Sequence, residues 1–448
     1  MAAALLGLTA SPANSWSSTD DTYSVVLDGS NWGNLHDVVA ATDGGSYTCG
    51  HFRGTVDMDP DPANTFTVTA ATTQPALIVK LDADGNYEWH TTVDSPNASV
   101  WKCAVDVAGN IYATGNFRTS ASVGAGDDVT TSASLGNTFV AKFNDAGAGQ
   151  WIRSIESTTE NLGYGIDVDA AGNTYTTGYF LQDADLDLDV GTTNIVSAHG
   201  NDWNDTFLVK LDQDGNTQWG HAWGGTENTL GRSVVVDNAG DIVVGGWTNP
   251  IQMDIDPDPV DELLVGDPSD DWHGNRNAWL SKFDSTGDLV WGHSFGSKSA
   301  DYIYALAVDA SNNIYATGET GRQGKAAWGG NWQTNSSLPD IVVTGMLHRD
   351  GYVAKFTPAG DTSWVSIFGG NGKEHAGLGI AVSGDAVYSA GRFNWTVDFT
   401  GGTSTTPVPG QVENAGGSHD PYLVRHNAAD GSFVCAAALI GKSGHEGL

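Results

Sequence analysis

The chain has 448 residues and a formal net charge of -35, from 54 acidic residues against 19 Lys and Arg. A surface this acidic repels phosphate backbones and anionic lipid headgroups, so we expect no nucleic-acid partner. The length suits several domains or one large repeat array, so internal repetition has to be tested first.

The N-terminal residues, MAAALLGLTASPANSW, contain a short apolar run followed by small residues up to Ala13. This pattern is similar to the end of a signal peptide that lacks its basic part. A disordered extension is the alternative. No other segment reaches the roughly 18 to 20 apolar residues that a membrane-spanning helix needs. We therefore expect an extension over 1–22, a single folded domain over 23–448, and no membrane span.

One half of a repeat reads VDVAGNIYATGNF at 105–117. It returns at 168–180, at 236–248 and from Val308, and more loosely from Ala41 and Val382. Alternating β-branched and aromatic residues around a short Asp/Asn/Gly turn predict a tight β-hairpin. The aspartates of two other hairpin strings, LDADGN at 81–86 and LDQDGN at 211–216, are expected to act as turn residues rather than metal ligands.

The other half reads FLVKLDQDGNTQW at 207–219 and predicts a second hairpin. Its copies lie at 77–89, 139–151, 279–291, 352–364 and 422–433. The two halves alternate along the chain, and the aromatics that close each second half are 62 to 73 residues apart. This period is too long for a helical solenoid and is typical of propeller blades with insertions.

A four-stranded sheet cannot cover both of its faces alone, so blades of this kind pack radially against one another. We predict an all-β fold, a β-propeller of four-stranded antiparallel blades. The expected blades cover about 35–95, 100–156, 164–224, 231–296, 303–369 and 378–441.

The strings DxFVxKxDxxGxxxW and VDxxGNxYxTG resemble the SBBP-type β-propeller repeat family of bacterial secreted and surface proteins. The resemblance extends from about Tyr23 to the end of the chain. It implies a propeller and a secreted or cell-surface location, and it implies little about activity because the family is defined by sequence. Two places depart from the pattern, Arg425–His426 in the last blade and 74–76 in the first.

The blade count depends on the two ends of the repeat. Tyr23 precedes Val38 by 15 residues, as Trp219 precedes Val234, so Tyr23–Asp28 is expected to be an outer strand with no blade before it. The C-terminal GKSGHEGL resembles the approach to another inner strand. Six blades with a spare edge strand is the preferred interpretation, and a seventh blade is the alternative.

The three cysteines, Cys49, Cys103 and Cys435, are too few and too odd in number for a disulfide framework. The fold is therefore expected to depend on its hydrophobic core. The cysteines do not by themselves indicate a redox compartment.

Long, variable connections join the two hairpins of each blade, and three of them carry alternating aspartates. Carboxylates on one side of an extended segment repel one another unless a hard cation such as Ca²⁺ lies among them. A solvated acidic edge strand that discourages aggregation is the alternative. The candidate calcium ligands are Asp57, Asp59, Asp61, Asp183, Asp185, Asp187, Asp189, Asp254, Asp256 and Asp258.

One basic position recurs in every blade and is expected to lay its stem over aromatic rings and pair with nearby aspartates. It is occupied by Lys80, Lys142, Lys210, Lys282, Lys355 and Arg425.

A heterogeneous position stands two residues before the apolar start of each inner strand, near the expected channel mouth. It could bind an anionic or hydroxylated small ligand, or it could be a solvated position at which the residue type varies without functional constraint. The candidate ligand-binding residues are His36, Lys102, Tyr164, Arg232 and Tyr304, with Leu378 in the sixth blade. Trp101 beside them, and Trp203 among the tryptophans of the connections, could stack on sugar rings or anchor loops.

The sequence contains no nucleophile elbow, phosphate-binding glycine loop, CxxC pair or HExxH motif. The leading hypothesis is a secreted or surface-exposed, non-enzymatic binding or structural module in adhesion or extracellular assembly, with Ca²⁺ as a candidate stabilising ion. Its expected partners are extracellular proteins or glycans. The alternatives are an enzyme acting on a carbohydrate or small molecule at the channel mouth and a subunit of an extracellular filament.

Overall fold

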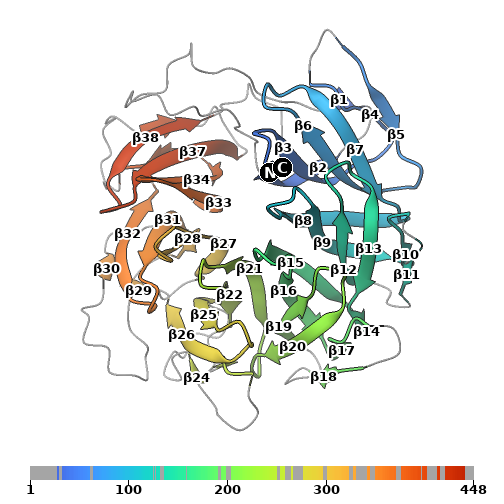
Figure 1. Cartoon of the computed structure of the whole chain (residues 1–448). Coiled ribbons are helices and arrows are strands. Elements are labelled where there is room, and N and C mark those ends of the chain that lie inside the picture. Colours follow the sequence, from blue (N-terminus) through green and yellow to red (C-terminus); the bar gives the residue numbers. More distant parts are fainter. Residues whose placement is uncertain are drawn as a thin grey trace. The chain divides into compact units, whose positions relative to one another are not determined.

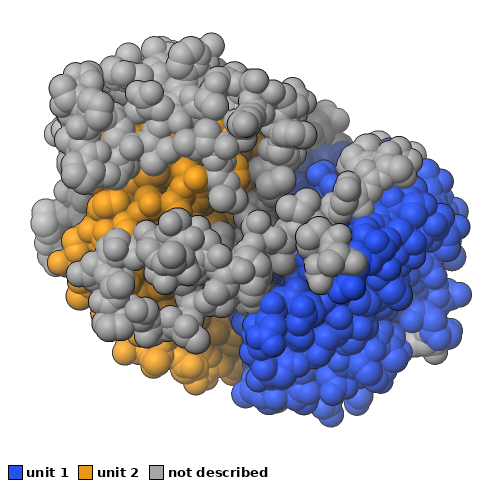
Figure 2. All heavy atoms as spheres, turned by 90° about the horizontal axis from the view of Figure 1, so that it is seen from above, with its two compact units in different colours: residues 1–13, 17–222 blue, residues 14–16, 223–448 orange. Residues whose placement is uncertain are grey.

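A computed structural model shows strands throughout the part of the chain that it describes, and no helix there is long and apolar enough to cross a membrane. Two compact units divide these residues between Ala222 and Trp223 (Figure 2). The described residues are 28–29, 33–60, 64–124, 126, 128–131, 136–157, 159–189, 193–197, 203–249, 253–257, 264–265, 276–295, 300–321, 326–328, 341–343, 349–369, 375–394, 396–400, 411–413 and 419–438.

The first unit contains three four-stranded antiparallel sheets, each with its strands paired in chain order (Figure 1). The first sheet consists of β2 (Asn34–Ala40), β3 (Ser46–His51), β6 (Ala76–Leu81) and β7 (Tyr87–Val93). The second consists of β8 (Asn97–Val105), β9 (Ile111–Arg118), β12 (Asn137–Phe143) and β13 (Gly149–Ser154). The third consists of β15 (Asn161–Val168), β16 (Thr174–Leu181), β19 (Asn204–Leu211) and β20 (Thr217–Trp223).

The second unit repeats this arrangement three times. Its first sheet consists of β21 (Thr229–Val236), β22 (Ile242–Thr248), β25 (Asn277–Phe283) and β26 (Leu289–Phe295). The next consists of β27 (Tyr302–Val308), β28 (Ile314–Thr320), β31 (Asp350–Phe356) and β32 (Thr362–Phe368). The last consists of β33 (His375–Ser383), β34 (Ala386–Phe393), β37 (Asp420–Asn427) and β38 (Phe433–Ala438). These sheets confirm the predicted all-β fold of four-stranded antiparallel propeller blades.

The hydrophobic core lies between neighbouring blades of a unit. Ile78 of the first blade packs in one cluster with Phe139 of the second, and Val140 from the same strand as Phe139 packs in another cluster with Phe207 of the third. Because side chains alternate across a strand, one strand serves both clusters. Burial between sheets is what radial packing of blades requires.

The hairpin turns are stabilised by their first aspartate. Asp106 accepts hydrogen bonds from the backbone N–H groups of Ala108 and Asn110, each at 2.9 Å, and Gly109 between them has a φ of +83°. Asp82 accepts the same pair of bonds in the turn at 81–86. These aspartates are turn residues, as the sequence predicted.

The repeated basic position packs against aromatic residues of its own sheet. Lys142 is in register with Tyr112 on one side and Trp151 on the other, and its Nζ lies 5.1 Å from the centre of the Tyr112 ring. The same cation–ring contact is made by Lys80 with Tyr47, Lys210 with Tyr175, Lys355 with Tyr315 and Arg425 with Tyr388. Lys282 faces a valine instead and contacts Asp237 and Asp241 at 2.8 and 2.9 Å. The position is architectural, as expected.

Each connection between the two hairpins of a blade carries a small extra hairpin. These are β4–β5 (Thr55–Asp57, Thr67–Thr69), β10–β11 (Ser120–Ala121, Val129–Thr130), β17–β18 (Asp183–Asp185, Ile195–Ser197), β23–β24 (Met253–Asp254, Leu264–Val265), β29–β30 (Ala326–Trp328, Ile341–Val343) and β35–β36 (Thr396–Asp398, Gln411–Glu413). The link that arrives from the preceding blade pairs with this hairpin, as β14 (Glu156–Ser157) does with β17. β1 (Asp28–Gly29) pairs with β4 in the same way. Residues 23–27 of the expected spare strand lie outside the described residues.

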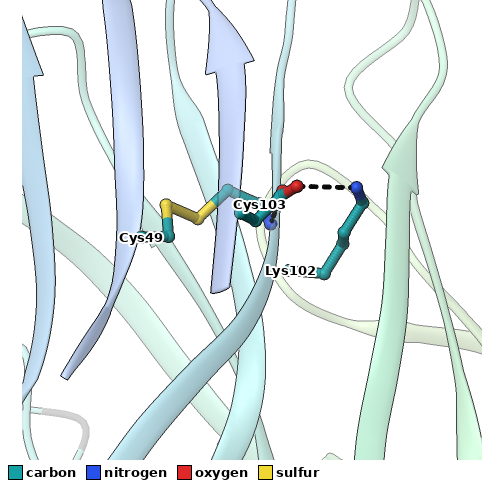
Figure 3. Close-up of a disulfide and its surroundings, with 4 residues drawn as sticks. Cys49, Lys102 and Cys103 are labelled. Carbon is teal, nitrogen blue, oxygen red and sulfur yellow. Dashed lines mark hydrogen bonds and ion pairs between the residues drawn. A yellow bond between two sulfur atoms is a disulfide. The ribbon is translucent and has the colours of Figure 1, made fainter. Parts of the chain in front are cut away.

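A disulfide joins the first two blades of the first unit. It connects Cys49 on β3 to Cys103 on β8, and both side chains are buried (Figure 3). The sequence argument that three cysteines make no disulfide framework did not foresee this bridge, because the pairing depends on how two separate blades pack. Cys435 lies on β38, outside the bridge.

Candidate functional site

Every innermost strand of the described blades contains a β-bulge, which adds one residue without a partner on the neighbouring strand. The bulges lie between Leu35 and Asp37, Val100 and Lys102, Gly163 and Gly165, Gly231 and Ser233, Ile303 and Ala305, and Gly377 and Gly379. We call the extra residues the bulge residues. They are His36, Trp101, Tyr164, Arg232, Tyr304 and Leu378.

The bulges explain the glycine that closes the TG pair of the repeat. In the second blade a Cβ on Gly115 would lie 1.9 Å from the carbonyl oxygen of Ser99, which only a residue without a side chain avoids. The equivalent glycines, Gly50, Gly178, Gly246, Gly318 and Gly391, each face a carbonyl oxygen at the same distance. Two features of the repeat therefore belong to the bulge: the extra residue on the innermost strand and the glycine opposite it on the neighbouring strand.

Trp101, rather than Lys102, occupies the bulge position of the second blade. The bulge ends before Lys102, which is paired with Thr114 on β9. Counting back from the apolar residues misplaced this position by one, because the bulge changes the alternation of side chains along the strand. The other predicted residues, His36, Tyr164, Arg232 and Tyr304, are bulge residues.

In the first unit, the bulge residues of three successive blades contact one another. The His36 ring lies 4.2 Å from the Trp101 ring, and Trp101 meets Tyr164 edge-on at 5.8 Å. Tyr164 in turn lies 5.9 Å from Tyr179 on β16. Trp101 Nε1 donates a hydrogen bond of 2.9 Å to Asn116 Oδ1, which orients the indole. We call His36, Trp101, Tyr164 and Tyr179 the first bulge surface.

The histidines at one end of this surface are uncharged at neutral pH. Burial, helped by the neighbouring His51, lowers the pKa of His36 to about 3. Burial also lowers the pKa of His51 to about 4. The two imidazoles approach at 3.3 Å, and His51 Nδ1 lies 2.7 Å from Ser99 Oγ. The first bulge surface is therefore neutral, with aromatic rings and few polar atoms.

Lys102 connects two blades. Its Nζ lies 2.7 Å from Asp37 Oδ1, and Asp37 Oδ2 accepts a hydrogen bond of 3.0 Å from the backbone N–H of Cys103 (Figure 3). In the second unit, Ser233 Oγ accepts the equivalent bond from Leu306 at 3.1 Å. The residue after the bulge thus positions the next blade. The charge of Lys102 contributes to this link through its ion pair with Asp37.

One bulge residue of the second unit, Arg232, carries a charge. The Arg232 guanidinium lies 5.5 Å from the Tyr304 ring, which stacks on Tyr302 at 5.4 Å with an interplanar angle of 11°. Arg276 lies 4.0 Å from the Trp247 ring and donates a hydrogen bond of 2.8 Å to the Tyr302 hydroxyl. We call these five residues the second bulge surface. It alternates guanidinium groups with aromatic rings.

The alternating aspartates begin the extra hairpins of the connections. Asp57 Oδ1 accepts hydrogen bonds from the N–H groups of Asp59 and Phe66, and Asp185 Oδ1 accepts the same kind of pair. Asp254 accepts from Asp256. Each of these carboxylates thereby stabilises the turn in which it lies.

The apolar residues between these aspartates point inward. Met58, Leu186 and Ile255 are fully buried, so the alternation anchors each hairpin on its blade. Asp61 and Asp258 lie outside the described residues. In the described part of the chain no group of three or more His, Cys, Asp or Glu residues could hold a metal ion. Calcium binding stays a prediction.

Of the tryptophans in the connections, Trp203 is described and is 40% exposed. It lies just before β19 and makes no part of either bulge surface. Trp272, Trp332 and Trp395 lie outside the described residues, and the side chain of Trp328 does as well.

No family model matches the chain. It is 22% identical over 403 residues to an uncharacterized WD repeat-containing protein, L264, of Acanthamoeba polyphaga mimivirus, covering 79% of this chain and 29% of that protein. It is 22% identical over 341 residues to the regulatory protein FlaEY of Caulobacter vibrioides, covering 73% and 33%. The chain thus spans about a third of the length of the curated relatives it matches.

Among solved structures, the chain is similar to quinohemoprotein alcohol dehydrogenase from Comamonas testosteroni, with a TM-score of 0.36 and 11% identity over 94% of this chain and 72% of that one. This likeness is too distant to carry an argument. The similarity to a WD repeat-containing protein extends over most of the chain and agrees with its repeated four-stranded sheets. The chain is a repeat protein of the β-propeller class.

Proposed function

We propose that this chain is a non-enzymatic binding module that acts outside the cytoplasm and takes hydroxylated ligands, with glycans as the principal class, on the first bulge surface. The observation that carries the proposal is the contact between His36, Trp101 and Tyr164, which come from three successive blades. Aromatic rings with a polar edge offer apolar faces to the C–H groups of a sugar and hydrogen-bonding atoms to its hydroxyls. A neutral surface suits a neutral ligand.

The disulfide supports the location. Disulfides form and persist in oxidising compartments and are rare where thiols are kept reduced. Cys49 and Cys103 are both buried and lie on strands of different blades, so the bond is part of how these blades pack. A structural bond of this kind favours a secreted or cell-surface protein.

Adhesion or extracellular assembly is the role we assign to this binding. The connections differ in length from blade to blade on a repeated scaffold, which is where binding specificity is usually found. Calcium bound by the acidic connections would stabilise the extra hairpins that these connections carry. The partners would be glycans or glycosylated proteins of a surface.

A glycan array probed with the intact protein tests the proposal, followed by the same array with Trp101→Ala. The strongest signals should fall by about five- to 150-fold, since a flat ring stacked on an aromatic side chain contributes on the order of 1 to 3 kcal/mol. Trp101→Phe should retain part of the binding. Trp203→Ala is the matched control, an exposed tryptophan outside the surface. Absence of any glycan signal, or equal loss in both alanine variants, would refute the proposal.

A further inference from the structure

Arg276 is held in place by two aromatic residues of the second bulge surface. Its Cζ lies 4.0 Å from the centre of the Trp247 ring and 5.5 Å from that of the Tyr302 ring. Its Nη1 donates a hydrogen bond of 2.8 Å to the Tyr302 hydroxyl. Trp247 and Tyr302 are both buried, and their rings meet edge-on at 5.9 Å. The two rings and the hydroxyl thus fix the position of the guanidinium group.

The next blade has an arginine at the same position and pairs it with an acid. Arg276 and Arg349 are equivalent, because each precedes the residue in register with the last threonine of the second strand of its blade. The backbone carbonyl of each also accepts a hydrogen bond from the first strand of the following blade or the residue before it. Arg349 Nη1 lies 3.6 Å from Glu319 Oε2. In the blade of Arg276, Trp247 stands in the place of Glu319.

Among the described residues, no carboxylate pairs with the Arg276 guanidinium. The backbone N–H of Asp301 donates to the Arg276 carbonyl at 2.6 Å, but the Asp301 carboxylate accepts hydrogen bonds from Thr320 Oγ1 and the N–H of Gly321, at 2.7 and 3.0 Å. Arg153, which also packs over a tryptophan, donates to two backbone carbonyls. Arg276 Nε and Nη2 make no such bond within the described part of the chain. These two donors are therefore available to a ligand.

We infer that Arg276 binds the carboxylate of an acidic saccharide at the second bulge surface, an inference that rests on the proposed function for its ligand class. Because Tyr302 engages Nη1, the edge formed by Nε and Nη2 remains, and two parallel N–H donors match the two oxygens of a carboxylate. The net charge of -35 repels polyanions. The ligand is therefore a saccharide with one uronic acid rather than a polyuronate.

Isothermal titration of the full chain with a glucuronic-acid-terminated disaccharide and its glucose-terminated counterpart tests the inference. The acidic disaccharide should bind about tenfold more tightly at low salt, and the preference should shrink as ionic strength rises, because salt screens charge attraction. Inorganic phosphate, added as a competitor, distinguishes a carboxylate site from a general anion site. It should displace the acidic disaccharide only weakly, and displacement at equal concentration would overturn the carboxylate assignment.

Arg276→Gln should remove the preference for the acidic disaccharide and leave the affinity for the neutral one unchanged. Arg276→Lys keeps the charge without the two parallel donors, so it should keep only a small part of the preference. Arg153→Gln is the matched control, an arginine over a tryptophan of the first unit, and should keep the full preference. Equal binding of both disaccharides, or a preference that survives in Arg276→Gln or disappears in Arg153→Gln, would overturn this inference alone. Absence of binding by either disaccharide would overturn both this inference and the glycan proposal.

Discussion

Breaking the bond between Cys49 and Cys103 should lower the free energy of unfolding by an amount that can be calculated from the structure. The cysteines are 54 residues apart in sequence, and closing a loop of that length lowers the entropy of the unfolded chain. The chain-entropy model gives about 4 kcal/mol at 25 °C. Each buried cysteine replaced by alanine adds a smaller loss of packing. We expect Cys49→Ala and Cys103→Ala each to lose about 4 kcal/mol of unfolding free energy in the unit that contains them.

Urea unfolding followed by tryptophan fluorescence, with and without reductant, measures this effect. The double variant should lose little more than the larger single loss, because either substitution already breaks the bond. Reductant should destabilise the unsubstituted protein by a similar amount and leave the two variants unaffected. Cys435→Ala, outside the bridge, is the control. Three reactive thiols in the denatured, unreduced protein, or additive losses in the double variant, would refute the reasoning.

Three further predictions concern the bulges, pH and calcium. Gly115→Ala should cost about 3 kcal/mol or more by denaturant unfolding because its Cβ would meet a carbonyl oxygen at 1.9 Å, whereas Gly379→Ala, with open space around it, should change stability by less than about 1 kcal/mol. The lowered pKa values of His36 and His51 mean that the unfolded chain takes up protons first as pH falls. Stability should therefore decline from about pH 6.5 toward pH 3, and a His36→Gln/His51→Gln variant should show a flatter profile in urea melts at several pH values. Calcium should raise the melting temperature and a chelator should reverse the rise; an unchanged melting temperature would leave the acidic connections as solvated hairpins.

The strands, their order within each blade and their turns could be predicted from the sequence because the contacts that form them are local. A hairpin turn such as that of Asp106 is closed by residues two and four positions away. The basic position of Lys142 recurs in every repeat and an aromatic neighbour recurs in most of them, so their contact was predictable from the repetition. Local hydrogen bonding and alternation are properties that one repeat carries by itself.

The candidate site was predictable only in part. His36 and Tyr164 were identified as a heterogeneous position on equivalent strands, but Lys102 was taken in place of Trp101, because the extra residue of a bulge shifts the alternation of side chains from which the position was counted. The glycine opposite the bulge was the available signal, since Gly115 has no other reason to recur within a buried strand.

The sequence by itself determined the repeating four-stranded unit, since the turns and the alternation that define each hairpin lie within one repeat. Only the tertiary structure decided which side chains of different blades meet. Cys49 reaches Cys103, Trp101 reaches Tyr164, and Arg232 reaches Tyr304, and each pair is separated by 54 residues or more. These meetings depend on the bulge register and on how one sheet packs against the next. A repeat pattern cannot specify them, because they are the positions at which the repeats differ.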